Sequence, residues 1–350
     1  MVPSPAGSLD DSRTCMAATT QSTATGPVPF KDIAGAVCLS ASLPTTTTPS
    51  VCMLSSATRG HGFGTSICPG SYPSSGASCR AAATSCSRAR PSAARRGSKA
   101  LAFATMARGA YPPARADEHP LSRLNPHDCV PFMEMLFFDG DGMGKMDALP
   151  SPRLMATHMH HSILPASIKD SADCKIIYIC RDPKDMVVSL WHFGRRAQPE
   201  LSFPYMFEDF CDGTSAAGPI WDHVLGYWNA SKEKPEKVLF LRYEEMLRDP
   251  AGNVRKLAQF VGQPFSPAEE EAGVAMDIVR LCSFDTLRNL VVNKAAAGSS
   301  PSPSSSPFAN DSYFRKGEDG DWVNHVTPDM ARRLDAVVEE KLRGSGLSFA

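Results

Sequence analysis

Apolar and polar residues follow two patterns along residues 98–350, short strand-like runs and longer helical stretches. Residues 175–180 read Lys-Ile-Ile-Tyr-Ile-Cys, a nearly continuous apolar run with β-branched side chains, which is typical of a strand buried on both faces of a parallel sheet. The next two residues, Asp182 and Pro183, are favoured at the first positions of a helix. A helix is therefore expected at 182–194.

The rest of this region continues the alternation. Further strands are expected at about 153–158 and 238–243, and further helices at about 99–107, 219–231 and 251–261, with others opening at Ser266 and Thr327. Strands that alternate with helices predict an α/β domain whose mainly parallel sheet is flanked by helices.

The first candidate for chemistry is Arg181, which follows strand 175–180 directly. In open α/β sheets, ligands bind at the carboxyl ends of the strands. A guanidinium group can hold a phosphate through two parallel hydrogen bonds. Ser189 lies about two helical turns later and can add a hydroxyl donor. The pattern predicts an anion site at this end of the sheet.

Residues 1–97 differ from the rest, because Ser, Thr, Ala, Pro and Gly dominate them. We expect this segment to be mostly disordered and a separate region from the domain at 98–350. Abundant Ser and Arg would also suit a chloroplast transit peptide, but Asp10, Asp11 and Asp32 argue against one.

Charge and composition exclude several classes of function. Residues 1–100 carry nine Lys or Arg and three Asp, about +6, whereas the whole chain carries a net charge of −1. No basic stripe with interleaved aromatics stands out in the body of the chain, so nucleic-acid binding is not expected. No apolar run approaches the roughly 20 residues of a membrane span. We therefore expect neither a nucleic acid nor a membrane as partner.

Metal binding is not expected either. The eleven cysteines include no Cys-x-x-Cys spacing, so neither a zinc site nor a disulfide framework is indicated. His158, His160 and His161 form a small cluster, but no Cys or carboxylate nearby in the sequence completes a metal site.

Four motifs, in order along the chain, resemble segments of the soluble sulfotransferases, most closely the plant members. They are Thr157-His158, Arg181-Asp-Pro-Lys-Asp185, Tyr243-Glu-Glu-Met246 and Arg315-Lys-Gly-Glu-Asp-Gly-Asp-Trp322. The resemblance covers roughly residues 99–350 and implies the P-loop-like sulfotransferase fold. It implies a location in the cytoplasm, with the chloroplast as the alternative. It also implies transfer of a sulfuryl group from 3′-phosphoadenosine 5′-phosphosulfate to a small hydroxylated acceptor such as a flavonoid, a phenolic or a steroid, by a monomer or weak homodimer.

The resemblance also assigns roles to individual residues. His158 corresponds to the general base that takes the proton from the acceptor. The residues that correspond to donor-binding positions are Arg181, Ser189, Arg315, Lys316 and Gly317 at the 3′-phosphate, and Tyr243 and Phe284 beside the adenine.

One motif of the family is missing. Its members carry a strand followed by Pro-Lys-x-Gly-Thr-Thr-Trp, which wraps the 5′-phosphosulfate, but this chain contains no Lys-x-Gly-Thr-Thr. Residues 92–98, Ser-Ala-Ala-Arg-Arg-Gly-Ser, precede the expected helix instead. We therefore expect the sheet to lack its first strand at the N-terminal edge and transfer to be impaired. The alternative is a non-catalytic remnant that binds a nucleotide or small ligand.

Overall fold

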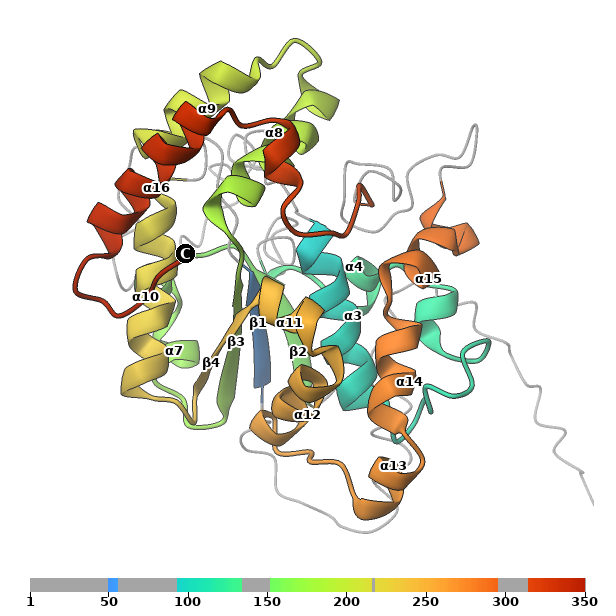
Figure 1. The fold of residues 1–350 in the computed structure, drawn as a ribbon. Coiled ribbons are helices and arrows are strands. Elements are labelled where there is room, and N and C mark those ends of the chain that lie inside the picture. Colours follow the sequence, from blue (N-terminus) through green and yellow to red (C-terminus); the bar gives the residue numbers. More distant parts are fainter. Residues whose placement is uncertain (1–49, 56–92, 134–151, 216–217, 295–313, 350) are drawn as a thin grey trace, which may run out of the picture.

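The computed structural model describes residues 50–55, 93–133, 152–215, 218–294 and 314–349. Their centre is a four-stranded, fully parallel sheet with strand order β2-β1-β3-β4 (Figure 1). The strands are β1 (Ser50–Ser55), β2 (Arg153–Thr157), β3 (Cys174–Cys180) and β4 (Val238–Arg242). This arrangement, with helices on both faces, confirms the predicted fold class.

The expectation that the sheet lacks its first strand is wrong. Strand β1, drawn in blue in Figure 1, lies between β2 and β3 and pairs with both, so that Val51 is level with Leu154 on one side and Lys175 on the other. Only a six-residue run, Ser-Val-Cys-Met-Leu-Ser, forms it. Such a short run carries little pattern of its own, and its pairing with two neighbouring strands determines its conformation. The remaining residues up to Ser92 lie outside the described part, so their predicted disorder stays a prediction.

The helices follow the strands in the expected alternation, although the first begins at Ala93, ahead of its expected start. The α-helices are α3 (Ala93–Ala107), α4 (Pro126–Cys129), α7 (Ala166–Lys169), α8 (Pro183–Ala197), α9 (Phe203–Cys211), α10 (Ile220–Glu233), α11 (Tyr243–Arg248), α12 (Pro250–Phe260), α13 (Pro267–Glu271), α14 (Val274–Leu281), α15 (Phe284–Asn289) and α16 (Pro328–Leu342). Short 3₁₀ helices are η1 (Pro120–Ser122), η2 (His161–Ile163), η3 (Val291–Asn293) and η5 (Asp321–Asn324).

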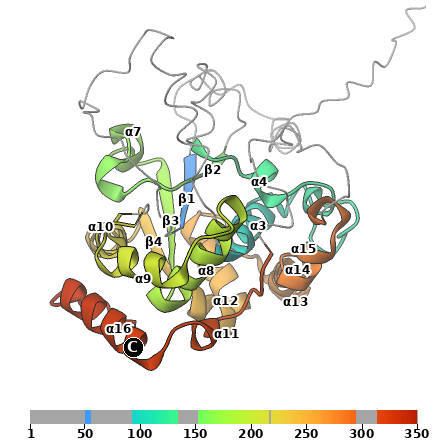
Figure 2. The ribbon, with the colours of Figure 1, turned by 90° about the horizontal axis from the view of Figure 1, so that it is seen from above.

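Strand β3 shows why both faces of the sheet are covered. Ile177 and Ile179 belong to the apolar cluster that also contains residues of α3, α12 and α14. Ile176 and Tyr178 belong to a second cluster, which α10 completes with Tyr227. Successive strand side chains point to opposite faces. The continuous apolar run therefore serves two cores, one on each side of the sheet (Figures 1 and 2).

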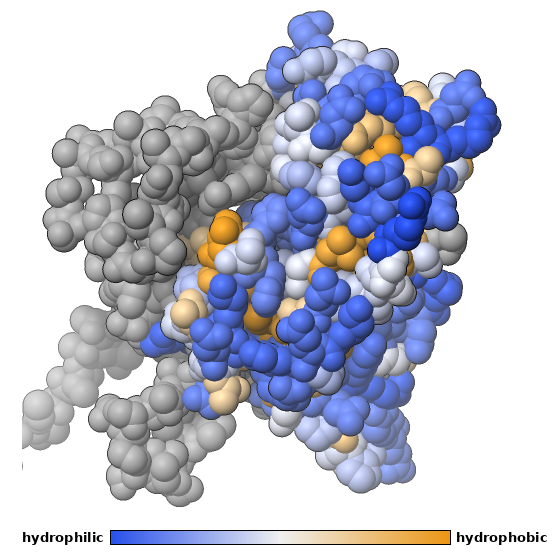
Figure 3. Space-filling model, turned by 90° about the vertical axis from the view of Figure 1, so that its left-hand side faces the viewer, coloured by the Kyte–Doolittle hydropathy of each residue, from blue (hydrophilic) through white to orange (hydrophobic). Residues whose placement is uncertain are grey.

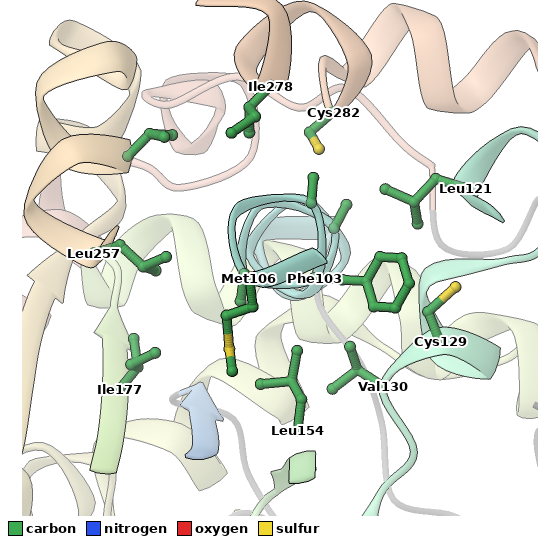
Figure 4. Packing of buried hydrophobic residues seen from close by; sticks show 14 of the residues in the cluster. Phe103, Met106, Leu121, Cys129, Val130, Leu154, Ile177, Leu257, Ile278 and Cys282 are labelled. Atoms are coloured by element: carbon green, nitrogen blue, oxygen red, sulfur yellow. The ribbon is translucent and has the colours of Figure 1, made fainter. Parts of the chain in front are cut away.

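Helix α3 forms the centre of the first core (Figure 4). Phe103 and Met106 point from it toward the residues of neighbouring elements, among them Leu154 of β2 and Leu257 of α12. Ala100, Ala102, Ala104 and Ala107 are fully buried on the same helix. Because these side chains are small, other helices can approach α3 closely, and the helix is fixed in position next to the sheet.

A third apolar cluster is formed by residues of helices α8, α9, α10 and α16. Ala331, Leu334, Val338 and Leu342 form the buried stripe of α16, at helical spacing. The outer side of this layer is mainly hydrophilic, with small separate apolar groups (Figure 3). Within the described residues, no helix combines the length and the apolar character needed to cross a bilayer.

Truncating β3 at its centre should cost much of the folding stability. Ile177→Ala removes a side chain with no exposed surface from the core that α3 completes. We expect the free energy of unfolding to fall by about 2 to 5 kcal/mol, as large-to-small core substitutions do. Val291→Ala is the control, because Val291 is 87% exposed and should change stability by less than about 0.5 kcal/mol. Equal urea midpoints for the two variants would contradict this account of the core.

Candidate functional site

Arg181 lies where β3 ends and α8 begins, and its side chain is almost completely buried. The sequence creates this junction because Asp182 caps the helix, its carboxylate accepting a hydrogen bond from the Lys184 amide at 2.7 Å. The Arg181 Nη2 atom donates to the Glu318 carbonyl oxygen at 2.6 Å and lies 3.2 Å from the Asp185 carboxylate. Its Nε atom is buried and has no hydrogen-bond partner among the described residues. An anion at this point could therefore accept a further hydrogen bond.

The loop before α16, residues 314–327, lies over Arg181 and next to α8 (Figure 1). Asp185 of α8 accepts hydrogen bonds from the backbone amides of Gly320 and Trp322, at 2.6 and 3.0 Å. The Tyr243 hydroxyl, at the start of α11, donates to the Gly317 carbonyl oxygen at 3.0 Å. Strand β3, helix α8, helix α11 and the loop therefore meet at one point.

Tyr243 is also part of the electrostatics of this junction. The guanidinium carbon of Arg181 lies 5.1 Å from the centre of the Tyr243 ring, within the range of a cation–π contact. Burial raises the pKa of the Tyr243 hydroxyl, although the nearby Arg181 charge acts in the opposite direction. The phenol therefore stays protonated near neutral pH and acts as a hydrogen-bond donor.

Gly317 and Phe284 are in direct contact. Gly317 has a φ of 77°, in the left-handed region, and a Cβ atom there would overlap the Phe284 ring. Phe284 begins α15, whose N-cap Ser283 accepts a hydrogen bond from the Thr286 amide. Its ring meets that of Phe314 edge-on, with centroids 5.9 Å apart. A glycine is required here both by the backbone conformation and by the close approach of the aromatic ring.

Arg315 and Lys316 share one carboxylate, that of Asp321, which accepts hydrogen bonds from both side chains. The Asn324 side-chain amide donates to the same carboxylate at 3.0 Å. Burial raises the pKa of Asp321, but the hydrogen bonds from Lys316 and Arg315 outweigh this effect and hold the pKa well below its usual range. A phosphate that binds these cations must therefore compete with Asp321.

Ser189 lies on α8 and is buried. His192, three residues further along, approaches His325 of the loop, with 3.4 Å between the two Nε2 atoms. Burial lowers the pKa of His192 to about 4, and the nearby charge of Arg315 contributes to this shift. His192 is therefore neutral at pH 7. Sequence reasoning gave no role to His192, Asp321 or His325, because they come together only when the loop folds against α8.

His158 follows β2 directly and is 7% exposed. Its imidazole stacks on the Phe132 ring, with centroids 4.4 Å apart and planes 22° apart. The Nε2 atom of His223, on α10, lies 3.3 Å from the His158 carbonyl oxygen and fixes the end of the strand. Because β2, β1 and β3 are parallel, His158 and Arg181 lie at the same edge of the sheet.

A buried lysine contacts Phe132, the ring on which His158 stacks. Lys99 of α3 is 1% exposed, and its Nζ atom donates to the Val130 carbonyl oxygen at 2.8 Å and lies 2.9 Å from the Nδ1 atom of His127. It also lies 3.3 Å from the centre of the Phe132 ring. Lys99 therefore links α3 to the aromatic side chain that stacks on His158. No signal in the sequence indicated this role, although Lys99 lies at the start of the helix expected at 99–107.

His160 and His161 pack against aromatic and histidine rings of α10. The ring of His160 lies 4.5 Å from that of His223, and the ring of His161 lies 5.3 Å from that of Tyr227. Their predicted lack of a metal stays a prediction.

Comparison with known proteins identifies the family. Residues 97–346 match the sulfotransferase domain family. The chain belongs to the sulfotransferases. It is 43% identical to cytosolic sulfotransferase 12 of Arabidopsis thaliana over 256 residues, which cover 72% of this chain and 75% of the relative. It is 44% identical to the flavonol 3-sulfotransferase of Flaveria bidentis over 253 residues, 71% of this chain and 78% of the relative.

A solved structure agrees with this result. The crystal structure of an Arabidopsis thaliana protein, described as a candidate steroid sulphotransferase, superposes with a TM-score of 0.57 at 33% identity, covering 86% of this chain and 79% of its own. The predicted plant-type sulfotransferase family is thereby confirmed. By family, the protein is an enzyme that uses 3′-phosphoadenosine 5′-phosphosulfate.

The structure of this sulfotransferase brings together most of the predicted donor-binding residues. Arg181, Tyr243 and Gly317 are joined by the contacts above, while Phe284 packs on Gly317 and Arg315 and Lys316 pair within the same loop. Ser189 lies on the adjoining helix. The family's Lys-x-Gly-Thr-Thr loop follows the first strand and precedes the next helix. Between β1 and α3, residues 56–92 of this chain lie outside the described part.

Two glycines of the loop offer a matched test of the packing around Gly317. Gly317 and Gly320 have nearly the same φ, 77° and 76°, but only Gly317 faces an aromatic ring, and a Cβ atom at Gly320 meets open space. Alanine at either position carries the left-handed strain of roughly 1–2 kcal/mol. We expect Gly317→Ala to lower the thermal unfolding midpoint further than Gly320→Ala, and Phe284→Ala to remove most of the difference. Equal midpoints for the two single variants would show that the ring does not constrain the loop.

Proposed function

We propose that this chain transfers a sulfuryl group from 3′-phosphoadenosine 5′-phosphosulfate to a hydroxyl group of a small acceptor. The observation that supports the proposal best is the position of Arg181. It is a buried guanidinium at the carboxyl end of a parallel strand, and its Nε donor has no partner among the described residues. A buried donor of this kind is costly unless a ligand accepts its hydrogen bond. The donor's 3′-phosphate supplies such an acceptor.

The other predicted residues suit the same ligand. Ser189 adds a hydroxyl group from α8, and Arg315 and Lys316 supply two positive charges that phosphate can take over from Asp321. The Gly317 backbone can approach a phosphate closely because it carries no side chain. Tyr243 and Phe284, which both contact Gly317, form the apolar surface on which the adenine would lie. We assign these six residues, together with Arg181, to donor binding.

His158 is the proposed general base. In the transfer, the acceptor oxygen forms a bond to sulfur while the bond from sulfur to the 5′-phosphate oxygen breaks, and the imidazole takes the acceptor's hydroxyl proton. Adenosine 3′,5′-bisphosphate leaves with the electron pair of the broken bond. Histidine is the side chain most often used as a general base in enzymes. The Phe132 ring, stacked on His158, supplies an apolar wall that would keep water from competing with the acceptor.

The relatives support a proposal for the acceptor and for the compartment. The Flaveria bidentis relative is a flavonol sulfotransferase, and the Arabidopsis thaliana structure is described as that of a candidate steroid sulphotransferase. We propose an acceptor of this kind, a flavonoid, another phenolic or a steroid. The name of cytosolic sulfotransferase 12 supports a cytoplasmic location, with the chloroplast as the alternative. We propose a monomer or weak homodimer as the active form. The proposed reaction involves no nucleic acid, membrane or metal.

A non-catalytic nucleotide-binding protein is the second candidate. The absence of Lys-x-Gly-Thr-Thr from the sequence favours it, because that loop supplies the lysine and the backbone amides around the 5′-phosphosulfate. Deleting a single such donor typically costs about 3 to 4 kcal/mol of transition-state stabilisation. We therefore propose that transfer by this chain is slow, although its 3′-phosphate residues and its base are retained.

Restoring the missing loop should raise the rate. In the test variant, Pro-Lys-Ser-Gly-Thr-Thr-Trp replaces residues 56–98 and joins β1 to Lys99. We expect transfer of labelled sulfate to a mixed panel of phenols, flavonols and hydroxysteroids to increase by about 10²-fold or more, as for an added transition-state donor.

The matched control carries Ala in place of the lysine of the restored loop and should lose most of the gain. Native activity equal to that of the restored chain would disprove the impairment. If the restored chain binds adenosine 3′,5′-bisphosphate but transfers nothing, the non-catalytic alternative is correct.

His158→Asn should abolish most transfer without loss of donor binding. Measured in the loop-restored chain, kcat is expected to fall by about 10²- to 10⁴-fold, the usual contribution of a general base. The affinity for adenosine 3′,5′-bisphosphate, determined by calorimetry, should stay unchanged. His161→Asn is the control, since His161 packs on Tyr227 and has no proposed role in transfer. A rate for His158→Asn close to that of the control would remove the base assignment.

A further inference from the structure

His192, Asp321 and His325 form a compact cluster beside the proposed donor site. One ligating atom of each, a ring nitrogen or a carboxylate oxygen, can be chosen so that all three lie within 4.8 Å of one another. The Nε2 atoms of the two histidines are 3.4 Å apart, and the His325 Nε2 atom is 3.5 Å from the Asp321 Oδ2 atom. His192 comes from α8, while the other two residues come from η5 and the residue that follows it.

These separations match the requirements of a small metal ion. Zinc binds histidine nitrogens at about 2.0–2.1 Å in tetrahedral geometry, which places two such nitrogens about 3.3 Å apart. Two imidazoles and one carboxylate are also one of the protein ligand sets found in zinc sites that keep a fourth position open. The cluster therefore has the donor types of such a site, and two of its separations, 3.4 and 3.5 Å, are close to the required spacing.

The surrounding charges limit the affinity. Arg315 and Lys316 already hydrogen-bond to Asp321, so an incoming cation competes with them for the carboxylate. Asp321 has two oxygens, and Asn324 also donates to one of them. A metal would have to displace the guanidinium of Arg315 from Oδ2. We therefore expect binding weaker than at a structural zinc site, in which every ligand is free for the metal.

We propose that His192, Asp321 and His325 form a binding site for one divalent transition-metal ion, with zinc, cobalt(II) and nickel(II) as the class that fits. The ion would connect α8 to the loop before α16 through ligands from both. This site adjoins the proposed donor site, because Arg315 and Lys316 pair with Asp321, but the proposal does not depend on the transfer reaction. Sequence spacing could not indicate it, because 128 residues separate His192 from the Asp321–His325 pair along the chain.

Cobalt(II) titration of the full chain tests the proposal. Cobalt(II) gives visible absorption bands whose intensity reports tetrahedral coordination, and thiolate ligands add a near-ultraviolet charge-transfer band that distinguishes binding to the chain's cysteines. We expect one equivalent bound by nitrogen and oxygen ligands. That equivalent should be lost in His192→Gln and in His325→Gln but kept in His161→Gln, a histidine outside the cluster.

A second measurement uses the unmodified chain, in case a variant fails to fold. Diethyl pyrocarbonate labelling, mapped by mass spectrometry, should slow at His192 and His325 when cobalt(II) is present, while labelling at His161 stays the same. The proposal is wrong if cobalt(II) binds only with thiolate character, or if the two histidines are labelled at the same rate with and without the ion.

Discussion

The buried ion pair between Arg181 and Asp185 determines how this site is assembled. Its two side chains are 6% and 1% exposed, and they join the end of β3 to the first turn of α8. A buried ion pair normally loses more in desolvation than it gains by attraction, unless further hydrogen bonds satisfy its remaining atoms. Here the loop before α16 supplies them, through the Glu318 carbonyl oxygen and the amides of Gly320 and Trp322. These hydrogen bonds to the ion pair hold the loop in place.

The same arrangement explains how an anion could be held without a large cationic surface. Asp185 forms an ion pair with Arg181, and Asp321 pairs with both Arg315 and Lys316, so its single charge offsets only one of the two cations. Each carboxylate positions its partner before a ligand arrives, so little side-chain entropy remains to be lost on binding. In the proposed donor site, a phosphate would take the place of Asp321 beside Arg315 and Lys316.

The sequence predicted the parts of the fold that depend on local pattern. The run at 175–180 identified β3, and Asp182-Pro183 identified the start of α8, because both signals lie within a few residues of the element they form. Arg181 could be placed at the sheet edge for the same reason. Strand β1 was missed because its six residues acquire their conformation from pairing with β2 and β3. Contacts such as that of His192 with His325 depend on how a loop folds across a helix, which no local pattern encodes.

The Arg181 half and the His158 half of the site are held by different parts of the chain. The half around Arg181 is held by β3, α8 and the loop before α16, whereas Phe132, on which His158 stacks, is supported from α3 through Lys99. Both α3 and the strand β1 are present; β1 pairs within the sheet and residues of α3 belong to the first core. The connection between them is where the family places its phosphosulfate loop, whose groups act on the leaving oxygen. We therefore expect a change confined to that connection to act mainly on the rate of transfer, because the contacts around Arg181 and His158 come from other elements.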